Sequence, residues 1–413
     1  MIHNSCIAHI DVDAFFASVL VRKNPRLGGK PLLALGMGGG CVIAASYEAK
    51  AKGVRTGMRL VDALTLTPDA IRIPSDFHEA ARASHEIESI LGESCPIVEQ
   101  MSIDEWFLDL PSLAGGLPKN LEYWAKNTQQ MILKRTALTV SVGVAPSKLL
   151  AKMASEYRKP AGITVIGQSI GMKEFLCDRP AAAIPGIGKR RNIHAEKEGW
   201  KTAWDIAQAP TEKLLSYFGR PGVELQRELL GESLSQVTGE SAPPKSVSRC
   251  RSFKQTKSRD LLWAHLLKHL EYTVLKMRRH ELMCKGISVW LRLGSDHDYD
   301  HCGANASLPQ PSQTADAILP FMHQCMEKIF DSALSYTQVG LALWHLVPLG
   351  ASQFSLFDNP KSSDREESIQ KSLDSLHQRF GRNSITRGSA LSVKSGTNPM
   401  LDVSVYDGVG SPS

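Results

Sequence analysis

The sequence lacks any C-x-x-C pair among its eight cysteines, which are Cys6, Cys41, Cys95, Cys177, Cys250, Cys284, Cys302 and Cys325. This scatter argues against both a zinc site and a disulfide framework, and it suits a reducing compartment. No run approaches 18 apolar residues, and the segment Met1–Ala14 carries acids in place of a long apolar stretch. We therefore expect a cytoplasmic protein with neither a signal peptide nor a membrane span.

A large excess of charge of either sign is also absent. The formal net charge is +6 and the sequence pI is about 8.8, which permits binding to nucleic acid without requiring it. Hydrophobic residues make up 42% and charged residues 22%, as in ordinary soluble proteins. The 413 residues exceed what one hydrophobic core supports, so we expect roughly three domains.

Two apolar stretches contain acids that have no evident partner nearby in the sequence. Met101–Leu110 holds the adjacent pair Asp104 and Glu105, and Ile7–Phe16 holds Asp11 inside an apolar run. Because a buried carboxylate needs a positive partner, we expect these segments to be neighbouring strands that bring the three acids together. Such a cluster of oxygens suits Mg²⁺, and a pair of divalent ions beside three carboxylates calls for a further anion such as a polyphosphate.

The local geometry of these acids is restricted. Neighbouring residues in a regular strand point to opposite faces, so Asp104 and Glu105 can share an ion only where the backbone bends. Asp13 precedes an expected helix over residues 14–22, and we interpret it as the cap of that helix. Asp11 has no helix of its own to cap, which favours a metal-binding role for it.

The first 170 residues predict an α+β domain with its acids on one sheet face. We expect strands over residues 5–12, 32–35, 41–46, 101–110, 138–144 and 163–166, and helices over residues 14–22, 76–92, 121–135 and 148–157. The glycine-rich segment 36–40 joins two strands with no following helix, so a hairpin loop fits it better than a phosphate cradle. Tyr47 and Lys50 lie one helical turn apart, where a hydroxyl and a cation could reach one anion; the alternative is a solvated helix face.

The segment Ile184–Arg191 has the pattern of a helix-hairpin-helix. Gly186 and Gly188 would let backbone N–H groups approach a phosphate, and Lys189 and Arg190 add positive charge. Such contacts would hold DNA without reading its sequence. The alternative is an ordinary turn between two helices.

The region after Pro243 and Pro244 predicts a further domain with the element order β-α-β-β-α-β. Its first strand carries alternating basic residues, including Arg249 and Arg251, that could follow a phosphate backbone or could simply be solvated. His265 and His269 have metal-ligand spacing, but no acid or cysteine completes a set, so we interpret them as surface residues.

The C-terminal tail begins with the peptide Ala351–Asp358, in which three large apolar residues stand in a polar context. This arrangement indicates either a peptide that docks in a partner's pocket or an unrecognised core strand. A short amphipathic helix is expected over residues 364–380, and the chain beyond it is rich in serine and glycine.

Several stretches together resemble the Y-family, the translesion DNA polymerases of the DinB/UmuC type. They are Ile10–Phe16, Ala45–Val54, Ser102–Glu105, Ser141–Lys152 and the dipeptide Lys159–Pro160, and they occur in that family's order and spacing. The resemblance runs from residue 1 to about residue 357. The segments 340–357 and 384–391 look closer to the UmuC branch than to the DinB branch.

The resemblance implies an α+β right-hand polymerase. Its parts would be a palm (1–13 and 76–168), fingers (14–75), a helical thumb that contains the helix-hairpin-helix (169–235), a linker (236–244), a little finger (245–348) and a tail (349–413).

Carried over by position, the resemblance also implies the site residues. Asp11, Asp104, Glu105 and the carbonyl of Val12 would bind two Mg²⁺ ions for in-line attack of a primer 3′-hydroxyl on the α-phosphate of an incoming dNTP. The nucleotide would be bound by Phe15, Phe16, Tyr47, Lys50 and Lys159, with Phe16 as an aromatic gate that a ribose 2′-hydroxyl would strike. The DNA would be contacted by Gly186, Gly188, Lys189, Arg190, Arg249 and Arg251. Gln353, Leu356 and Phe357 match a peptide that binds the sliding clamp.

Three positions depart from the usual family pattern. Lys50 stands where most relatives have arginine, which removes a bidentate fork for the triphosphate. Trp106 follows the acid pair where a small residue is common, and Leu20 replaces an acid often found there. None of these changes removes an expected metal ligand.

We therefore expect a monomeric, low-fidelity DNA polymerase that copies past damaged bases. Its partners would be primer-template DNA, a dNTP, the sliding clamp and, as the UmuC-like tail suggests, accessory proteins of the SOS response. One alternative is a catalytically silent relative that recruits partners to the clamp, but such relatives lack the acids that are all present here. A helix-hairpin-helix glycosylase or nuclease would need a lysine or aspartate nucleophile just after the hairpin, and Asn192–Glu196 is a poor fit.

Overall fold

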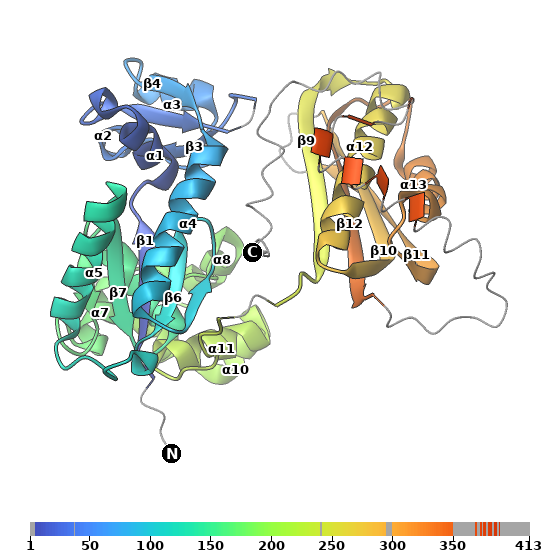
Figure 1. The fold of residues 1–413 in the computed structure, drawn as a ribbon. Coiled ribbons are helices and arrows are strands. Elements are labelled where there is room, and N and C mark those ends of the chain that lie inside the picture. Colours follow the sequence, from blue (N-terminus) through green and yellow to red (C-terminus); the bar gives the residue numbers. More distant parts are fainter. Residues whose placement is uncertain are drawn as a thin grey trace. The chain divides into compact units, whose positions relative to one another are not determined.

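The computed structural model describes residues 5–36, 38–239, 242–294 and 300–349, together with scattered positions between 368 and 388. The chain divides into two compact units whose boundary falls between residues 241 and 242, inside the expected linker 236–244. Figure 1 traces the elements of each unit in the order of the sequence. We describe the two units separately.

Unit 1 is built around a five-stranded sheet with the strand order β5-β6-β1-β7-β8. Its strands are β1 (Ile7–Val12), β5 (Val98–Gln100), β6 (Glu105–Asp109), β7 (Val140–Ala145) and β8 (Ile163–Val165). β1 lies between β6 and β7 and pairs antiparallel with both. β1 is buried along its whole length because helices pack on both faces of the sheet, which explains why residues 7–10 form a continuous apolar or neutral run.

Helices cover both faces of this sheet (Figure 1). The helices α4 (Phe77–Ser94) and α5 (Leu121–Thr136) share a core with Ala8, Ile10 and Val12 of β1. The helix α6 (Lys148–Tyr157) packs on the opposite face, with Ile7 in its core. Because side chains alternate along a strand, Asp11 lies on the α6 side together with Ile7. Ser147 caps α6 as expected, since its hydroxyl accepts the N–H of Leu150.

A second sheet of unit 1 has the strand order β3-β2-β4. It consists of β2 (Leu32–Leu35), β3 (Val42–Ala45) and β4 (Ile71–Pro74), and its neighbours are α1 (Phe15–Lys23), α2 (Tyr47–Ala51) and α3 (Leu60–Leu66). β2 and β3 are antiparallel, so the glycine-rich segment between them is a hairpin loop, as predicted. The sequence analysis did not identify α3 and β4, which are short and follow a turn-rich segment.

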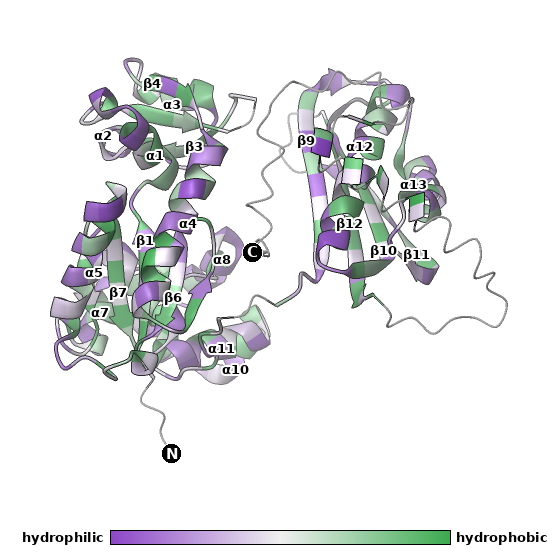
Figure 2. Ribbon diagram, viewed as in Figure 1, coloured by the Kyte–Doolittle hydropathy of each residue, from purple (hydrophilic) through white to green (hydrophobic). Residues whose placement is uncertain are grey.

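The rest of unit 1 is helical. The helices are α7 (Met172–Asp178), α8 (Lys189–Lys197), α9 (Ala203–Ala207), α10 (Thr211–Phe218) and α11 (Arg220–Leu229), with a one-turn helix η3 (Ala181–Ala183) before the glycine hairpin. Their apolar faces join the core on the α6 side of the main sheet. Figure 2 shows that α8 is largely hydrophilic, whereas the central strands β1 and β7 are hydrophobic.

Unit 2 has the predicted β-α-β-β-α-β order. Its elements are β9 (Ser246–Thr256), α12 (Arg259–Arg279), β10 (Leu282–Leu293), β11 (His301–Ser312), α13 (Ala315–Ile329) and β12 (Tyr336–Pro348). They form an antiparallel sheet with the strand order β11-β10-β12-β9, so the basic strand β9 is an edge strand. The two helices share one core with this sheet.

The interpretation of His265 and His269 as surface residues is wrong. Both side chains are buried on the face of α12 that packs against β9, and the ring of His265 stacks on Phe253 with 5.2 Å between the ring centroids. Burial lowers the pKa of His265 to about 4 and that of His269 to about 3, and the nearby Arg249 and Arg251 add to the effect. The helical spacing that suggested ligands therefore belongs to an inward face of the helix.

We expect the folding stability to fall as the pH is lowered from about 6.5 toward 4. Below 6.5 the unfolded chain binds protons at His265 and His269, whereas the folded chain does not until pH 4 to 3. Each histidine can then cost up to about 1.4 kcal/mol per pH unit. Urea unfolding at pH 7 and pH 5 tests this expectation, with the double variant His265→Phe and His269→Leu as the comparison. An equal pH dependence in the variant would contradict it.

None of the helices within the described residues is long and apolar enough to span a membrane. The eight cysteines are all free thiols.

Candidate active site

The expected convergence of chain-distant acids is confirmed for Asp11 and Glu105. The antiparallel register of β1 and β6 places these two residues directly opposite each other. Directly opposed residues project from the same face of a sheet, so both carboxylates lie on the α6 side. The backbone N–H of Val12 also donates to the carbonyl oxygen of Asp104 at 3.0 Å, which holds the second acid of the pair beside β1.

The backbone bend that the adjacent acids require is also present. β6 begins at Glu105. The carbonyl oxygen of Glu105 accepts hydrogen bonds from the N–H groups of Met101 and Ser102 in the preceding turn. Asp104 therefore lies on this turn instead of on the regular strand, and its carboxylate accepts a hydrogen bond from the Ser102 hydroxyl. Trp106 is fully buried in the core on the opposite face, so this unusual residue packs away from the acids.

The structure adds Glu156, which the sequence analysis did not identify. Oxygen atoms of Asp11, Glu105 and Glu156 all lie within 4.8 Å of one another, while the side chain of Asp104 is not part of this cluster. Glu156 comes from the last turn of α6, the helix that covers this face of the sheet. Its position three residues before Lys159 was the available signal, but that spacing is also common in surface ion pairs.

Two lysines form ion pairs with the three acids of the cluster. The Lys159 ammonium contacts Asp11 at 2.5 Å and Glu156 at 2.7 Å, and Lys152 of α6 forms an ion pair with Glu105. Burial raises the pKa of Asp11 to about 8 although Lys159 opposes the change. Burial likewise raises the pKa of Asp104. The acids thus occupy an environment that favours a cationic partner.

The interpretation of Asp13 as a helix cap is wrong. The N-terminal cap of α1 is Ala14, which makes no capping side-chain bond and has a left-handed backbone with φ of 47°. The Asp13 carboxylate instead accepts hydrogen bonds from the Ser141 hydroxyl at 2.8 Å, the Ala161 N–H at 2.8 Å and the Tyr47 hydroxyl at 3.3 Å. Asp13 therefore fixes the turn between β1 and α1 to three other segments around the site.

The expected nucleotide-binding residues surround the same region. The Lys50 ammonium lies 4.5 Å from the centre of the Tyr47 ring, and burial together with Lys159 lowers its pKa. Phe15 is buried in the core, whereas the half-buried ring of Phe16 packs edge-on against Phe77 with 5.3 Å between centroids. Lys50 and Lys159 are close enough for their charges to repel, which an anion between them would relieve.

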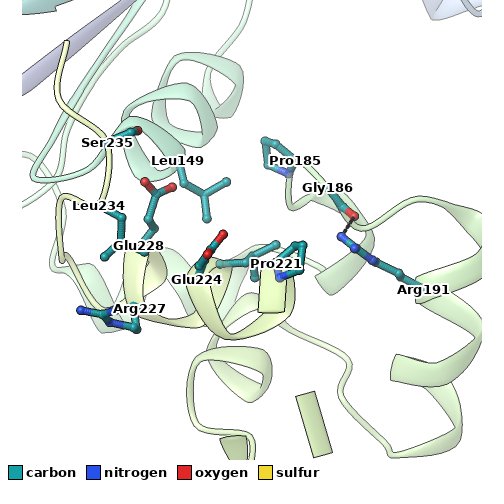
Figure 3. Close-up of a pocket in the computed structure, with 11 residues that line it drawn as sticks. Leu149, Pro185, Gly186, Arg191, Pro221, Glu224, Arg227, Glu228, Leu234 and Ser235 are labelled. Carbon is teal, nitrogen blue, oxygen red and sulfur yellow. Dashed lines mark hydrogen bonds between the residues drawn. The ribbon is translucent and has the colours of Figure 1, made fainter. Parts of the chain in front are cut away.

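The glycine hairpin that precedes α8 has the expected geometry. Gly186 has a φ of 96°, a conformation that favours glycine, and Gly188 caps α8. The Arg191 side chain turns back and donates to the Gly186 carbonyl at 2.9 Å (Figure 3). Lys189 and Arg190 remain exposed at the start of the helix.

A pocket of about 570 Å³ lies beside this hairpin. Figure 3 shows the carboxylates of Glu224 and Glu228 among its lining residues. Arg191 and Arg227 also line the pocket, so it contains charges of both signs, whereas the exposed start of α8 carries the two cations Lys189 and Arg190.

The expected DNA contacts of unit 2 lie on β9, and the expected clamp peptide follows β12 in the sequence. Arg249 of the edge strand β9 lies against α12, with its guanidinium 4.1 Å from the centre of the Tyr272 ring. Arg251 is two residues further along the same face of the strand and remains exposed. The clamp peptide with Gln353, Leu356 and Phe357 lies outside the described residues, as does most of the expected helix 364–380.

Comparisons with known proteins show the family of this chain. The impB/mucB/samB family matches residues 10–156, and the C-terminal domain of that family matches residues 244–356. The DNA polymerase IV of Xanthomonas axonopodis pv. citri is 33% identical over 352 residues, which cover 85% of this chain and 97% of that protein. The chain belongs to the Y-family of DNA polymerases.

Further relatives extend the likeness over most of the chain. The DNA polymerase IV 1 of Halalkalibacterium halodurans is 30% identical over 405 residues and covers 93% of each chain. A solved Y-family chimera of the polymerases Dbh and Dpo4 matches with a TM-score of 0.73 at 25% identity, and the match covers 83% of this chain and 99% of the chimera. The DinB of Sulfolobus solfataricus matches over the same shares with a TM-score of 0.55. These relatives are of the DinB type, and the expected likeness of residues 340–357 and 384–391 to the UmuC branch stays a prediction.

Proposed function

We propose that this Y-family polymerase extends a primer 3′-hydroxyl with dNTPs on a DNA template, with low fidelity and past damaged bases. The observation that carries the proposal is the direct pairing of Asp11 with Glu105 across β1 and β6, with Asp104 on the adjoining turn. Acids from distant parts of the chain are therefore held together, and the chain belongs to a family of DNA polymerases.

The donor set fits Mg²⁺. Carboxylate and carbonyl oxygens are the ligands that this ion prefers, and the clustered oxygens of Asp11 and Glu105 provide them. Asp11, Asp104, Glu105 and the carbonyl of Val12 would hold two ions. Bound Mg²⁺ would lower the pKa of the primer hydroxyl and offset the charge of the triphosphate.

The chain's own residues would orient the nucleotide. Tyr47, Lys50 and Lys159 stand beside the acids and would contact the triphosphate oxygens, because each offers a hydroxyl or ammonium donor. The Lys159 ammonium pairs with Asp11 in this structure. When the acids bind metal, the ammonium would exchange this contact for one with a phosphate oxygen. Phe15 supports Phe16, whose ring would lie against the sugar.

DNA would be held mainly through its phosphates. The exposed start of α8, with Gly186, Gly188, Lys189 and Arg190, presents backbone N–H groups and two cations. Arg249 and Arg251 of the edge strand would add contacts in unit 2. Such contacts give affinity that depends on salt and not on sequence.

Replacing Lys189 and Arg190 together by alanine should weaken binding to primer-template DNA about 5- to 10-fold and lower the salt slope by about two. Anisotropy titrations at several salt concentrations measure both quantities. Lys197→Ala with Lys201→Ala is a matched control, because these lysines lie at or beyond the other end of the same helix. An equal loss in the control would argue against a specific role of the hairpin.

Deletion of residues 353–357 should leave extension of short primers unchanged and abolish its stimulation by a sliding clamp. The apolar residues Leu356 and Phe357 would insert into a pocket of the clamp, so their loss removes the tether without touching the acids. Extension assays with and without clamp separate the two effects. Equal clamp stimulation of the deleted and intact proteins would refute the assignment.

The proposed activity is tested by primer extension with purified protein, Mg²⁺ and dNTPs on an intact template and on one with a single abasic site. We expect extension on both templates. We also expect the protein to be a monomer in the cytoplasm. Extension of neither would favour the alternative of a clamp-bound recruitment protein. Extension that appears only after accessory proteins of the SOS response are added would indicate an obligatory activator.

A further inference from the structure

Glu156 has a position that the proposed catalysis does not yet use. Its carboxylate lies within 4.8 Å of oxygens of Asp11 and Glu105, yet its side chain is 44% exposed, against 6% for Asp11. It therefore stands at the rim of the cluster. The Lys159 ammonium contacts the Glu156 carboxylate at 2.7 Å.

The helix that carries Glu156 is firmly seated. Gly143 of β7 leaves no room for a Cβ, which would lie 2.1 Å from the Ala151 carbonyl oxygen, so α6 packs directly on the sheet backbone. The buried His9 ring is 2.7 Å from the Ser155 hydroxyl, which itself donates to the Lys152 carbonyl at 2.8 Å. Because Ser155 precedes Glu156, these contacts fix the backbone at the base of that side chain.

Lys159 is held differently. It follows the end of α6, and its ammonium bridges two carboxylates, those of Asp11 and Glu156. Once Asp11 engages a divalent cation, the ammonium loses that partner and is repelled by the added positive charge. Glu156 then remains as the carboxylate that keeps the lysine at the edge of the site.

We propose that Glu156 is a positioning residue that holds the Lys159 ammonium in place for the triphosphate of the incoming nucleotide. This inference rests on the proposed function, in which Lys159 contacts that triphosphate. Glu156 acts through the lysine, so its effect requires the lysine. Its exposure distinguishes it from Asp11, the deeply buried acid expected to hold metal.

The test measures nucleotide binding without chemistry. A primer ending in a dideoxynucleotide, paired with its template, is bound to the full-length protein in Ca²⁺, and the dissociation constant of the matching dNTP is measured by tryptophan fluorescence. We expect Glu156→Ala to weaken dNTP binding about 10-fold, the size of one hydrogen bond to a charged group, with unchanged affinity for DNA. The dNTP affinity of Glu156→Gln should lie between those of the intact protein and Glu156→Ala, because the glutamine amide oxygen still accepts a hydrogen bond from the Lys159 ammonium.

A double-mutant cycle distinguishes positioning from other roles. In the background of Lys159→Ala, the change Glu156→Ala should have no further effect on dNTP binding. Glu93→Ala is the matched control, since Glu93 is an exposed acid on the last turn of α4 that pairs with Arg135 away from the site. We expect this control to bind dNTP like the intact protein.

Two results would overturn the proposal. The first is unchanged dNTP binding in Glu156→Ala. The second is a loss that persists undiminished in the Lys159→Ala background and is restored by raising the cation concentration, which would make Glu156 a metal ligand. If Lys159→Ala leaves dNTP binding unchanged, the proposed contact between Lys159 and the triphosphate is wrong. If Lys159→Ala weakens dNTP binding and Glu156→Ala does not, only the positioning role of Glu156 is wrong.

Discussion

Replacing Glu105 by glutamine is expected to reduce primer extension by about 10³-fold or more while the affinity for primer-template DNA stays within about twofold. The carboxylate lies opposite Asp11 on the same face of the sheet and is paired only with Lys152 among the ion pairs of the site. Loss of its charge weakens a divalent-cation site worth several kcal/mol of transition-state stabilisation, and about 4 kcal/mol corresponds to 10³-fold. Phosphate contacts outside the acid cluster account for DNA binding and should persist.

Single-turnover extension and DNA anisotropy, measured on the same preparation, separate these two effects. Asp109→Asn is the matched control, because Asp109 ends the same strand β6 at a position opposite Ile7, away from the acids. We expect the control to retain extension. Near-normal extension by Glu105→Gln would remove the basis of the proposed catalysis, whereas equal loss in both variants would indicate damage to the strand itself.

The main features of the site could be predicted from the sequence because a buried acid in an apolar strand is costly. That cost singles out Asp11, Asp104 and Glu105 without knowledge of the fold, and the structure clusters the side chains of Asp11 and Glu105 but not that of Asp104. A bend at Asp104 could be predicted because neighbouring residues of a regular strand point to opposite faces. The resemblance to the Y-family then supplied roles for Tyr47 and Lys50, whose spacing alone left a solvated helix face open, and for Lys159.

Other features depend on tertiary contacts that a local pattern does not contain. Asp13 has the sequence context of a helix cap, but its carboxylate is taken up by Ser141, Ala161 and Tyr47 from distant segments. From the sequence, Glu156 resembles a member of a surface ion pair with Lys159. Only the packing of α6 on the sheet brings it to Asp11 and Glu105. His265 and His269 were misplaced for the same reason, because helical spacing identifies a face but not the direction in which it points.

The second prediction with a large effect concerns the choice of sugar. Phe16→Ala should lower the preference for dNTP over the matching ribonucleotide by about 100-fold. The ring of Phe16 is half-buried and braced by Phe15 and Phe77, at 5.3 Å between centroids in each case, so it cannot move aside for a 2′-hydroxyl without disturbing both. Removing a steric clash of roughly 3 kcal/mol would account for a change of this size.

Steady-state insertion of a dNTP and of its ribonucleotide opposite one template base gives the preference as a ratio of kcat/KM values. Phe16→Tyr is the matched control, because it keeps the ring and should keep the preference. Thermal unfolding checks that the alanine variant folds, since a partly buried ring is lost. The ratio of two substrates on one enzyme is insensitive to the fraction of active protein, so an unchanged ratio in Phe16→Ala would show that another group excludes the ribose hydroxyl.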